Sequence, residues 1–447
     1  MLDLNSKNVL VCGLGRSGIA SAIILKKLGA SVTVSDLRSE DELDLSRLSG
    51  VKLCLGKNPD AIVKDQDLII MSPGIPTDLP FVKLARENKI PVWSEIELAY
   101  RISKAPFIAI TGTNGKTTTT ALTGEIVRNY KKNSVVAGNI GIALTEKVLD
   151  ADENSYVIAE ISSFQLETID LFCPHISAIL NLTVDHLNRH KTFENYCAAK
   201  ANIFRNQNEN DYTVLNYDDE ICRQLANKTK AKVVFFSTEN KLDEGVFLDE
   251  GKIKIQLDNI NETLMKIDEI NLLGKHNISN VLAAVSISVC AGVPVNIIYD
   301  SVKNFKAVSH RLEFVREIRG IKFYNDSKAT NVDSAIKALE SINNPIVLIG
   351  GGYDKNVDYY DWINKFKNVK QLILIGEVKN KIAMQCRQLG FNNFIICETF
   401  EEAVKKSFEI ANANDCVLLS PACASWDMFK NFEQRGDLFK SIVNSLS

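Results

Sequence analysis

A repeated succession of a short apolar run, a turn and a helix-patterned stretch is the feature that most constrains how this chain can fold. The run Val9–Cys12 leads into Gly13-Leu-Gly15-Arg-Ser-Gly18, and apolar residues then recur at helical spacing to about Leu28. Comparable apolar runs occupy residues 31–35, 67–71, 107–110, 156–159, 176–180, 212–215, 321–324, 346–349, 371–375, 394–396 and 416–419. Strands that alternate with helices predict parallel sheets covered on both faces, so the expected fold class is α/β.

The chain has 447 residues, which is too many for one compact core and suggests about three domains. The strand and helix pattern restarts after Pro106 and again near residue 308. We therefore predict a Rossmann-like parallel sheet over residues 1–94, a P-loop-type α/β domain over 95–308 and a second Rossmann-like domain over 309–447. Within the central domain, residues 236–268 alternate and are rich in charge, which predicts antiparallel hairpins before a helix over 277–291.

The charge balance excludes some classes of partner. With 52 Lys and Arg against 55 Asp and Glu, the net charge is −3, so nothing predicts bulk attraction to nucleic acid or to a membrane surface. The ten cysteines are scattered without a C-x-x-C pair, which favours reduced thiols over a disulfide framework or a zinc site. The sequence shows neither a secretory signal pattern nor an apolar run long enough to span a bilayer. We expect a cytoplasmic protein and, because no coiled coil or long apolar patch is evident, a monomer.

The first glycine loop, with Gly13, Gly15 and Gly18, lies between a predicted strand and a predicted helix. Asp36 follows at the end of the next predicted strand, where an acid can reach a ribose hydroxyl. Small residues at a helix amino terminus admit a diphosphate. Three interpretations stay open on this pattern alone: an NAD(P) site, a site for another nucleotide diphosphate, or a tight turn without a ligand.

The second glycine loop, Thr111-Gly-Thr-Asn-Gly-Lys-Thr-Thr118, is more specific. It departs from the Walker A spacing because its first glycine is Gly112 and Ile110 stands five residues before Gly115. It keeps the groups that phosphate binding needs, namely amides at a helix amino terminus, the charge of Lys116 and the Thr117 hydroxyl for Mg²⁺. A nucleoside triphosphate site is the favoured interpretation and a structural turn is the alternative.

This loop resembles the phosphate loop of the ATP-dependent muramyl ligases and the related folylpolyglutamate synthetases, and the resemblance covers essentially the whole chain. Four further motifs resemble the branch of the family that adds D-glutamate: Gly138-Asn-Ile-Gly141, Glu160-Ile-Ser-Ser-Phe-Gln-Leu-Glu167, Asn325-Asp-Ser-Lys-Ala-Thr-Asn331 and Leu419-Ser-Pro-Ala-Cys-Ala-Ser425. The resemblance implies that ATP phosphorylates the L-alanyl carboxylate of UDP-N-acetylmuramoyl-L-alanine. The amine of D-glutamate then attacks the acyl phosphate, giving ADP and phosphate, in peptidoglycan precursor synthesis.

The resemblance also implies a catalytic centre with ATP and two Mg²⁺ ions. Its catalytic residues are Lys116, Glu160, His186 and Lys200, and its metal ligands are Thr117, Glu160, His186 and Lys200. Lys200 is expected as a carbamate, since reaction with CO₂ converts an ammonium that repels Mg²⁺ into an anionic oxygen ligand. The plainer alternatives are a solvated acid at Glu160 and an exposed helix lysine at Lys200. His190 is expected to lie on the surface without a role.

Three ligand sites complete what the resemblance implies. The ATP site comprises Gly112, Thr113, Asn114, Gly115, Lys116, Thr117, Thr118, Asn277, Arg311 and Asp326, with a helix cap as the alternative role of Asn277. The UDP-sugar site comprises Arg16, Ser17, Asp36, Leu37, Arg38, Gly74, Asn139, Ser162 and His186. The D-glutamate site comprises Lys328, Thr330, Lys355, Ser420 and the backbone at Phe429, with a turn cation as the alternative role of Lys355.

Three rival functions remain at this point. An NAD(P)-binding oxidoreductase would rest on residues 13–36 alone and would leave Lys116 and Lys200 unexplained. Another muramyl or folylpolyglutamate ligase would keep the chemistry and change the substrate, which the motif at 325–331 argues against. A catalytically silent nucleotide-binding module is disfavoured because all the expected chemical groups are present.

Overall fold

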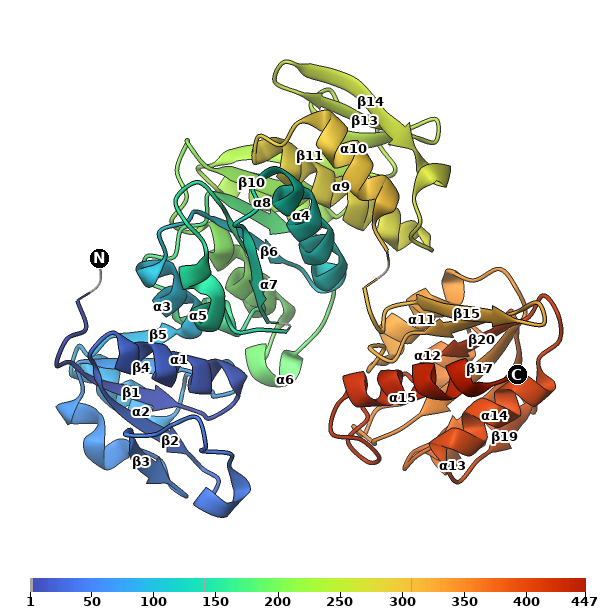
Figure 1. Ribbon diagram of the computed structural model, residues 1–447, viewed down its shortest axis with the longest axis horizontal. Helices are drawn as coiled ribbons and strands as arrows, with labels where there is room; N and C mark the ends of the chain where they lie inside the picture. The colour runs from blue at the N-terminus through green and yellow to red at the C-terminus, as the bar shows by residue number, and fades with distance from the viewer. Residues whose placement is uncertain (1–2, 140, 307) are drawn as a thin grey trace. The chain divides into compact units, whose positions relative to one another are not determined.

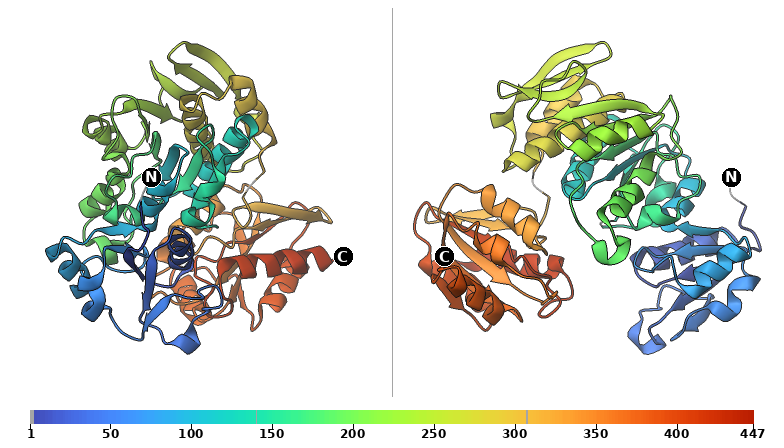
Figure 2. Two further views of the ribbon diagram at one scale, coloured as in Figure 1. Left: turned by 60° about the vertical axis from the view of Figure 1, so that its left-hand side comes forward. Right: turned by 180° about the vertical axis from the view of Figure 1, so that it is seen from behind.

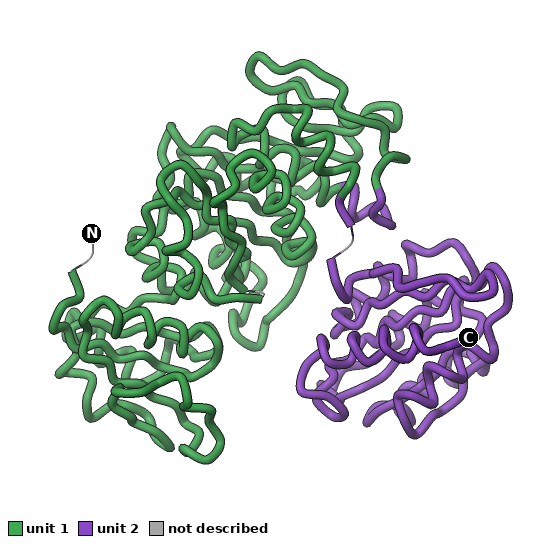
Figure 3. Tube along the Cα trace, viewed as in Figure 1, with its two compact units in different colours: residues 1–270, 279–304 green, residues 271–278, 305–447 purple. Residues whose placement is uncertain are grey.

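The computed structural model describes residues 3–139, 141–306 and 308–447, and it contains three β-sheets (Figure 1). The chain separates into two compact units (Figure 3). One unit comprises residues 1–270 and 279–304 and holds two of the sheets; the other comprises residues 271–278 and 305–447 and holds the third. The expected α/β class is confirmed, whereas the domain boundaries near residues 94 and 308 stay predictions.

The first sheet is parallel, with the strand order β3-β2-β1-β4-β5. Its strands are β1 (Asn8–Cys12), β2 (Ser31–Asp36), β3 (Lys52–Leu55), β4 (Leu68–Met71) and β5 (Val92–Ser94). Alternate residues of β1 face opposite cores: Val9 and Val11 pack with α1 (Arg16–Lys27), and Leu10 packs with α2 (Pro80–Glu87). A sheet covered on both faces in this way is the arrangement that the apolar runs predict.

The second sheet has nine strands in the order β14-β13-β12-β11-β10-β9-β6-β8-β7. They are β6 (Phe107–Thr111), β7 (Val135–Gly138), β8 (Val157–Glu160), β9 (Ile176–Ile179), β10 (Tyr212–Asn216), β11 (Lys232–Ser237), β12 (Gly245–Asp249), β13 (Lys252–Leu257) and β14 (Ile260–Lys266). The hairpins expected before the long helix are confirmed, because β12, β13 and β14 pair antiparallel. The rest of the sheet is parallel, and its fully buried strand β6 leads directly into the second glycine loop.

The helices of this region surround that sheet (Figure 2). They are α3 (Glu95–Ile102), α4 (Lys116–Tyr130), α5 (Leu144–Lys147), α6 (Leu187–His190), α7 (Phe193–Ala201), α8 (Glu220–Leu225), α9 (Lys275–Cys290) and α10 (Val295–Asn304). Short 3₁₀ turns complete the first unit: η1 (Glu40–Glu42), η2 (Asp60–Asp65), η3 (Val148–Asp150), η4 (Gln165–Thr168), η5 (Asn202–Phe204), η6 (Ala226–Lys228) and η7 (Ile267–Glu269).

The third sheet has the order β15-β16-β20-β17-β18-β19, and only β15 pairs antiparallel. Its strands are β15 (Glu313–Ile318), β16 (Ile321–Asn325), β17 (Ile346–Gly351), β18 (Val369–Ile375), β19 (Phe394–Ile396) and β20 (Cys416–Leu419). Two cores lie on its two faces, one under α11 (Val332–Glu340), α12 (Tyr360–Ile363) and α13 (Lys379–Gln388), the other under α14 (Phe400–Ile410) and α15 (Phe432–Ser445).

All ten cysteines are free thiols, as the scattered spacing predicted. Across the described ranges, every helix is too short or too polar to cross a bilayer.

Candidate active site

The second glycine loop joins β6 to α4 at the carboxyl edge of the nine-stranded sheet. Gly112 and Gly115 have φ angles of 152° and 82°, which favour glycine. A Cβ on Gly115 would lie 2.1 Å from Oδ1 of Asn280, so a side chain there would displace its neighbour. Asn181 fixes the tip of the loop, since its Oδ1 accepts the amide N–H of Asn114 at 2.8 Å. The loop is therefore a rigid turn that presents the amino terminus of α4.

Two lysines converge on one carbonyl of this loop. Nζ of Lys116 and Nζ of Lys200 each donate to the carbonyl oxygen of Gly112 at 2.8 Å. Lys200 is only 2% exposed, so the alternative of an exposed helix lysine is wrong. Burial, and then the charge of Lys116, hold the pKa of Lys200 well below its usual value. A neutral amine at this position can react with CO₂, whereas an ammonium cannot.

Tyr196 supports Lys200, and the sequence interpretation missed it. Both residues lie on α7, where a spacing of four residues places them on one face. The hydroxyl of Tyr196 is 3.0 Å from Oγ1 of Thr113, and Nζ of Lys200 lies 4.9 Å from the centre of the Tyr196 ring. Burial raises the pKa of this phenol, which keeps it protonated. The four-residue spacing between Tyr196 and Lys200 is the sequence signal that could have identified Tyr196.

Glu160 is the last residue of β8 and lies beside β6 and β7 at the same edge of the sheet. Its side chain is buried, which excludes the alternative of a solvated surface acid. Asn139 donates from Nδ2 to Oε1 of Glu160 at 3.0 Å, so a predicted UDP-sugar residue contacts a predicted metal ligand. In the motif 138–141, residue 140 lies outside the described residues.

His186 and Ser162 lie on the two segments that follow β9 and β8. His186 has a φ of 51°, its side chain is about half exposed, and its backbone N–H donates to Oδ1 of Asp185 at 2.8 Å. Its ring centre lies 4.9 Å from that of Phe164. Ser162 Oγ donates to Oε1 of Gln165 at 3.0 Å, which closes the turn between them. His186 is therefore accessible to a ligand, and Ser162 shapes the turn beside it.

His190 is not a surface residue, and that expectation is wrong. The residue is 7% exposed, its ring stacks on Phe164 at 5.4 Å, and its Nε2 lies 3.0 Å from Oγ of Ser163. Burial lowers its pKa, so the neutral ring is favoured. The one-turn helix α6 points this ring inward, an orientation that helical periodicity cannot resolve over four residues.

The residues predicted to hold Mg²⁺ can be tested against the donors that they offer. Among the residues that the structure describes, no group of three or more His, Cys, Asp or Glu side chains is placed to hold a metal. The Thr117 hydroxyl and the buried Glu160 carboxylate are hard oxygen donors beside the second glycine loop. They fit Mg²⁺, because this ion usually takes only one or two protein ligands and completes its coordination with water and phosphate oxygens. Lys200 fits this role only with an added oxygen group.

The first glycine loop joins β1 to α1. A Cβ on Gly18 would lie 1.8 Å from the carbonyl oxygen of Gly13, so helix and loop approach at van der Waals contact. Oδ2 of Asp36 accepts the amide N–H of Leu14 at 2.8 Å, and the carboxylate binds the guanidinium of Arg38 at 2.9 and 2.8 Å. The Arg38 partner holds the pKa of Asp36 far below its usual value. Asp36 therefore stays ionised and fixes the loop.

The other predicted UDP-sugar residues gather around this loop at the carboxyl ends of neighbouring strands. Arg16 and Ser17 begin α1, Leu37 is an exposed residue after β2, and Gly74 follows β4. Nη1 of Arg16 donates to the carbonyl oxygen of Gly141 at 2.7 Å, which links the first loop to the 138–141 turn. This edge, where the strand order reverses, is the usual ligand position in open α/β sheets.

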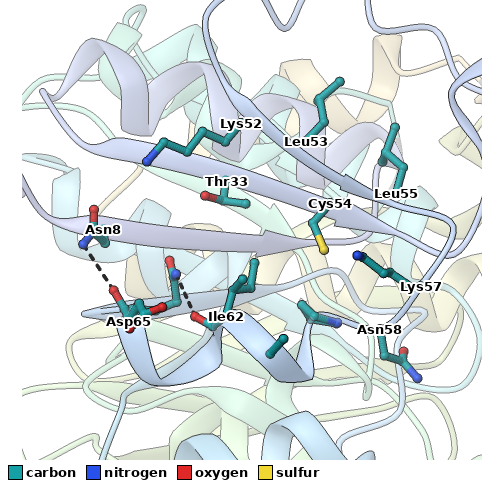
Figure 4. A pocket seen from close by; sticks show the side chains of 13 residues that line it. Asn8, Thr33, Lys52, Leu53, Cys54, Leu55, Lys57, Asn58, Ile62 and Asp65 are labelled. Atoms are coloured by element: carbon teal, nitrogen blue, oxygen red, sulfur yellow. Dashed lines mark hydrogen bonds between the residues drawn. The ribbon is translucent and has the colours of Figure 1, made fainter.

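A pocket of about 570 Å³ lies away from these residues, beside β3 (Figure 4). Its wall includes Asn8 at the start of β1, Thr33 on β2, Cys54 on β3, and Ile62 and Asp65 on η2. None of the predicted site residues lines it. A short 3₁₀ turn, η2, connects β3 to β4 and supplies part of the pocket wall.

In the second unit, Asp326 and Ser420 follow the paired strands β16 and β20. Oγ of Ser420 donates to Oδ2 of Asp326 at 2.8 Å, and the amide N–H of Leu312 donates to Oδ1 at 3.3 Å. Burial raises the pKa of Asp326 to about 7, while the charge of Arg311 opposes that shift. The structure thus brings together Arg311, Asp326 and Ser420, which were predicted for two different ligands.

Arg435 organises this site, and the sequence interpretation missed it. Its guanidinium is fully buried and donates to Oγ and to the carbonyl oxygen of Ser327 at 2.9 and 2.7 Å, and to the carbonyl oxygen of Cys423 at 3.2 Å. Burial lowers its pKa to about 10. An arginine on an amphipathic helix is ordinarily exposed, so the sequence carried no signal for this contact.

The predicted D-glutamate residues lie around the same loops. Nζ of Lys355 donates to the carbonyl oxygen of Thr330 at 3.3 Å and lies 5.3 Å from the ring centre of Trp426. Nζ of Lys328 lies over the ring of Phe432 at 5.5 Å. The amide of Phe429 donates to Ser425, which argues against that N–H as a carboxylate contact.

Asn277 is the third residue of α9, which begins at Lys275 and not at Asn277 as expected. Its Nδ2 donates to the carbonyl oxygen of Leu273 at 2.6 Å. An amino-terminal cap would instead accept a backbone N–H through the side-chain oxygen, so this contact ties the helix to the preceding turn.

Three family models match the chain in succession. The Mur ligase MurD-like N-terminal domain matches residues 7–94, the Mur ligase middle domain matches 110–288, and the glutamate ligase domain of the Mur ligases matches 310–423. The three matches coincide with the three sheets, and nothing in them corresponds to a dehydrogenase.

Curated relatives match over the full length. The UDP-N-acetylmuramoylalanine–D-glutamate ligases of Thermoanaerobacter pseudethanolicus and Clostridioides difficile are 48% and 46% identical to this chain, with 100% of each chain covered. Among solved structures, the UDP-N-acetylmuramate-alanine ligase of Thermotoga maritima has a TM-score of 0.64 at 19% identity and covers 98% of this chain and 99% of its own. A murein peptide ligase from Psychrobacter arcticus has a TM-score of 0.57 at 14% identity, with 99% and 100% covered.

Proposed function

The chain belongs to the Mur ligase family, and on that premise we propose that it joins D-glutamate to UDP-N-acetylmuramoyl-L-alanine at the expense of ATP. The observation that carries the proposal is the pair of lysines on the carbonyl of Gly112, one of them buried with a lowered pKa. A phosphate-binding loop beside a lysine that can form a carbamate is an arrangement suited to phosphorylating a carboxylate.

The phosphorylation step rests on the loop 112–118. Its amides and Lys116 bind the ATP phosphates and spread the charge of the transferring phosphoryl group. The proposed assignment also gives Asn277, Arg311 and Asp326 to the nucleotide. A carboxylate oxygen is a poor leaving group, so converting it to an acyl phosphate is what lets an amine displace it.

The residues that would hold Mg²⁺ are Thr117, Glu160, His186 and carbamylated Lys200, in two sites. When bound, the ions would neutralise part of the negative charge of the phosphate groups. The low pKa of Lys200 supports the carbamate, because its neutral nitrogen can attack CO₂ and lose a proton to give an anionic group. Tyr196 and the Gly112 carbonyl hold that nitrogen in place beforehand.

The UDP-sugar is proposed to place its uridine diphosphate at the first glycine loop, among Arg16, Ser17, Asp36, Leu37, Arg38 and Gly74. Asn139, Ser162 and His186 serve the part of the substrate nearer the reacting carboxylate. The contact between Arg16 and the carbonyl of Gly141 supports one continuous site, because it joins these two groups within the same unit.

D-Glutamate is proposed to bind in the second unit, where Lys328 and Lys355 face its two carboxylates and Thr330 and Ser420 complete the site. Lysine ammonium groups are suited to carboxylates as point charges.

We also propose a cytoplasmic location, since the UDP-sugar and ATP are cytoplasmic substrates. A monomeric state is part of the same proposal.

The test measures phosphate release from ATP in the presence of UDP-N-acetylmuramoyl-L-alanine and single amino acids. The panel contains D- and L-glutamate, D- and L-alanine, L-lysine and diaminopimelate. We expect release with D-glutamate alone, and release that follows another amino acid would assign the chain to a different addition step. NAD(P)H fluorescence on mixing checks the oxidoreductase alternative, for which we expect no change.

A further inference from the structure

The helix α6 is too short to be stable without contacts to other parts of the fold. It has four residues, Leu187–His190, and it follows His186, whose φ of 51° turns the chain sharply. A single helical turn is not stable by itself in water. The placement of His186 therefore depends on how the side chains of α6 are anchored.

Arg189 supplies an anchor that reaches two other segments of the chain, the one that contains η4 and the turn after β4. Its Nε and Nη2 donate to the two carboxylate oxygens of Glu167 on η4, at 3.2 and 2.6 Å. Nη2 also donates to the carbonyl oxygen of Ile75 at 2.8 Å, and the guanidinium lies 5.3 Å from the ring centre of Phe164. The side chains of Arg189 and Glu167 are 15% and 14% exposed, so this two-pronged ion pair is shielded from solvent.

The contact with Ile75 ties α6 to the first glycine loop. Ile75 closes the turn after β4, where its amide donates to the carbonyl oxygen of Ser72 at 3.1 Å. Oγ of Ser72 in turn donates to the carbonyl oxygen of Gly13 at 2.8 Å. One chain of contacts therefore runs from the segment of His186 through Arg189 and this turn to the loop at Gly13.

We propose that Arg189 is a positioning residue that fixes the distance between the uridine diphosphate end and the phosphorylated end of the UDP-sugar site. The inference rests on the proposed function. A single substrate must engage both ends at once, so a small shift of the turn at 72–75 against His186 would misplace the carboxylate that is phosphorylated. His190 anchors α6 to Ser163 in the central region, whereas Arg189 adds the link to the first sheet.

The experiment compares Arg189→Ala with a matched control, Arg205→Ala. Nη2 of Arg205 also donates to backbone carbonyls, those of Ile169 and Asp170 at 2.7 and 3.1 Å, beyond the other end of η4. Arg189→Ala should raise the KM for the UDP-sugar by at least about tenfold, because the two ends of the site would no longer be held at the separation that one substrate needs. The KM values for ATP and D-glutamate should change by less than about twofold, and Arg205→Ala should leave all three within that range.

Two further measurements separate positioning from simple loss of stability. Guanidinium ion at low, non-denaturing concentration should partly restore Arg189→Ala and should not affect Arg205→Ala. Glu167→Gln, which keeps the size of the side chain, should raise the same KM selectively, and this variant decides the matter if Arg189→Ala fails to fold.

The outcomes also separate this inference from the proposed function. Wild-type phosphate release that does not depend on D-glutamate defeats the proposed function before any variant is made. With a D-glutamate-dependent wild type, an unchanged KM for the UDP-sugar in the folded variant overturns the role of Arg189. An equal rise of all three KM values, or the same rise in Arg205→Ala, overturns it too.

Discussion

At the scale of the residue, the chemistry depends on where charge is buried. Lys200 is a lysine with almost no exposure, no carboxylate partner in hydrogen-bond contact among those described, and a second ammonium directed at the same carbonyl. Burial of a cation without a close counter-charge is costly, and the neutral amine is the form that lowers this cost. The site is thereby prepared for the added anionic group that we propose.

Replacing Lys200 tests this interpretation. Lys200→Ala should lower kcat by at least about 100-fold, in the range found when one stabilising group of an active site is removed. Short-chain carboxylic acids added to the variant should restore part of the rate by supplying the missing oxygens. Lys232→Ala is the control, because Lys232 also lies over a tyrosine ring, at 5.6 Å from Tyr212, but is exposed. Near-normal activity in Lys200→Ala would refute the carbamate.

Replacing Lys355 tests the amino-acid site. Lys355→Ala should raise the KM for D-glutamate by roughly tenfold and leave the KM for ATP nearly unchanged, because a carboxylate loses its ionic partner. Lys365→Ala is a suitable control, since Lys365 pairs with Glu340 at 3.1 Å on the same unit. Steady-state kinetics with each substrate varied in turn decide the matter, and an unchanged KM for D-glutamate would remove Lys355 from the site.

Sequence reasoning at this scale succeeded where a residue follows a strand and failed where a side chain turns inward from a helix. Glu160, Asp326 and Ser420, which the resemblance assigned to the sites, lie at the carboxyl end of a strand or directly after it. His190 and Arg435 were misjudged or missed, because a histidine or an arginine on a helix is ordinarily assigned to the surface. Their burial depends on tertiary contacts with Ser163 and Ser327, and the local sequence pattern does not predict such contacts.

At the scale of the element, most of the missed strands share a position in the fold. β3, β5, β7, β11 and β15 were not predicted, and all of these except β11 are edge strands of their sheets. Edge strands bury fewer side chains, so their sequences lack the continuous apolar run of a central strand such as β6. The two central strands that carry the glycine loops, β1 and β6, were predicted to within about two residues.

One buried acid joins two elements of the first unit and gives a testable pH dependence. Glu95 begins α3, and its Oε1 accepts the N–H and the hydroxyl of Thr145 on α5 at 2.6 and 2.9 Å. Burial raises the pKa of Glu95 to about 7 from its usual value of 4.5. Between those two values the folded protein holds a proton that the unfolded chain releases, so stability falls as the pH rises through this window.

Glu95→Gln should remove that dependence, because the amide keeps an acceptor for Thr145 and does not ionise. Relative to the wild type, the variant should gain stability on the order of 3 kcal/mol between pH 4.5 and pH 7. Urea unfolding of both proteins at several pH values measures the difference. Parallel curves for the two proteins would show that Glu95 ionises at its usual pKa.

At the scale of the whole molecule, the chain has three sheets, to which we assign the three proposed ligand sites, and a net charge of only −3. The anionic substrates that we propose would bind to local groups, namely two glycine loops, the pair of lysines at Gly112 and Lys355 beside Trp426. The chain length and the restarts of the strand pattern predicted the number of sheets. They did not predict the division into two compact units, because that division depends on contacts between the first two sheets.

The central claim is that ATP activates the L-alanyl carboxylate as an acyl phosphate before D-glutamate attacks it. The most direct measurement uses UDP-N-acetylmuramoyl-L-alanine labelled with ¹⁸O in that carboxylate and follows the label by mass spectrometry. One labelled oxygen should appear in the inorganic phosphate, and the other should remain in the new amide. Phosphate without label in a reaction that still forms the D-glutamyl product would contradict the acyl-phosphate route.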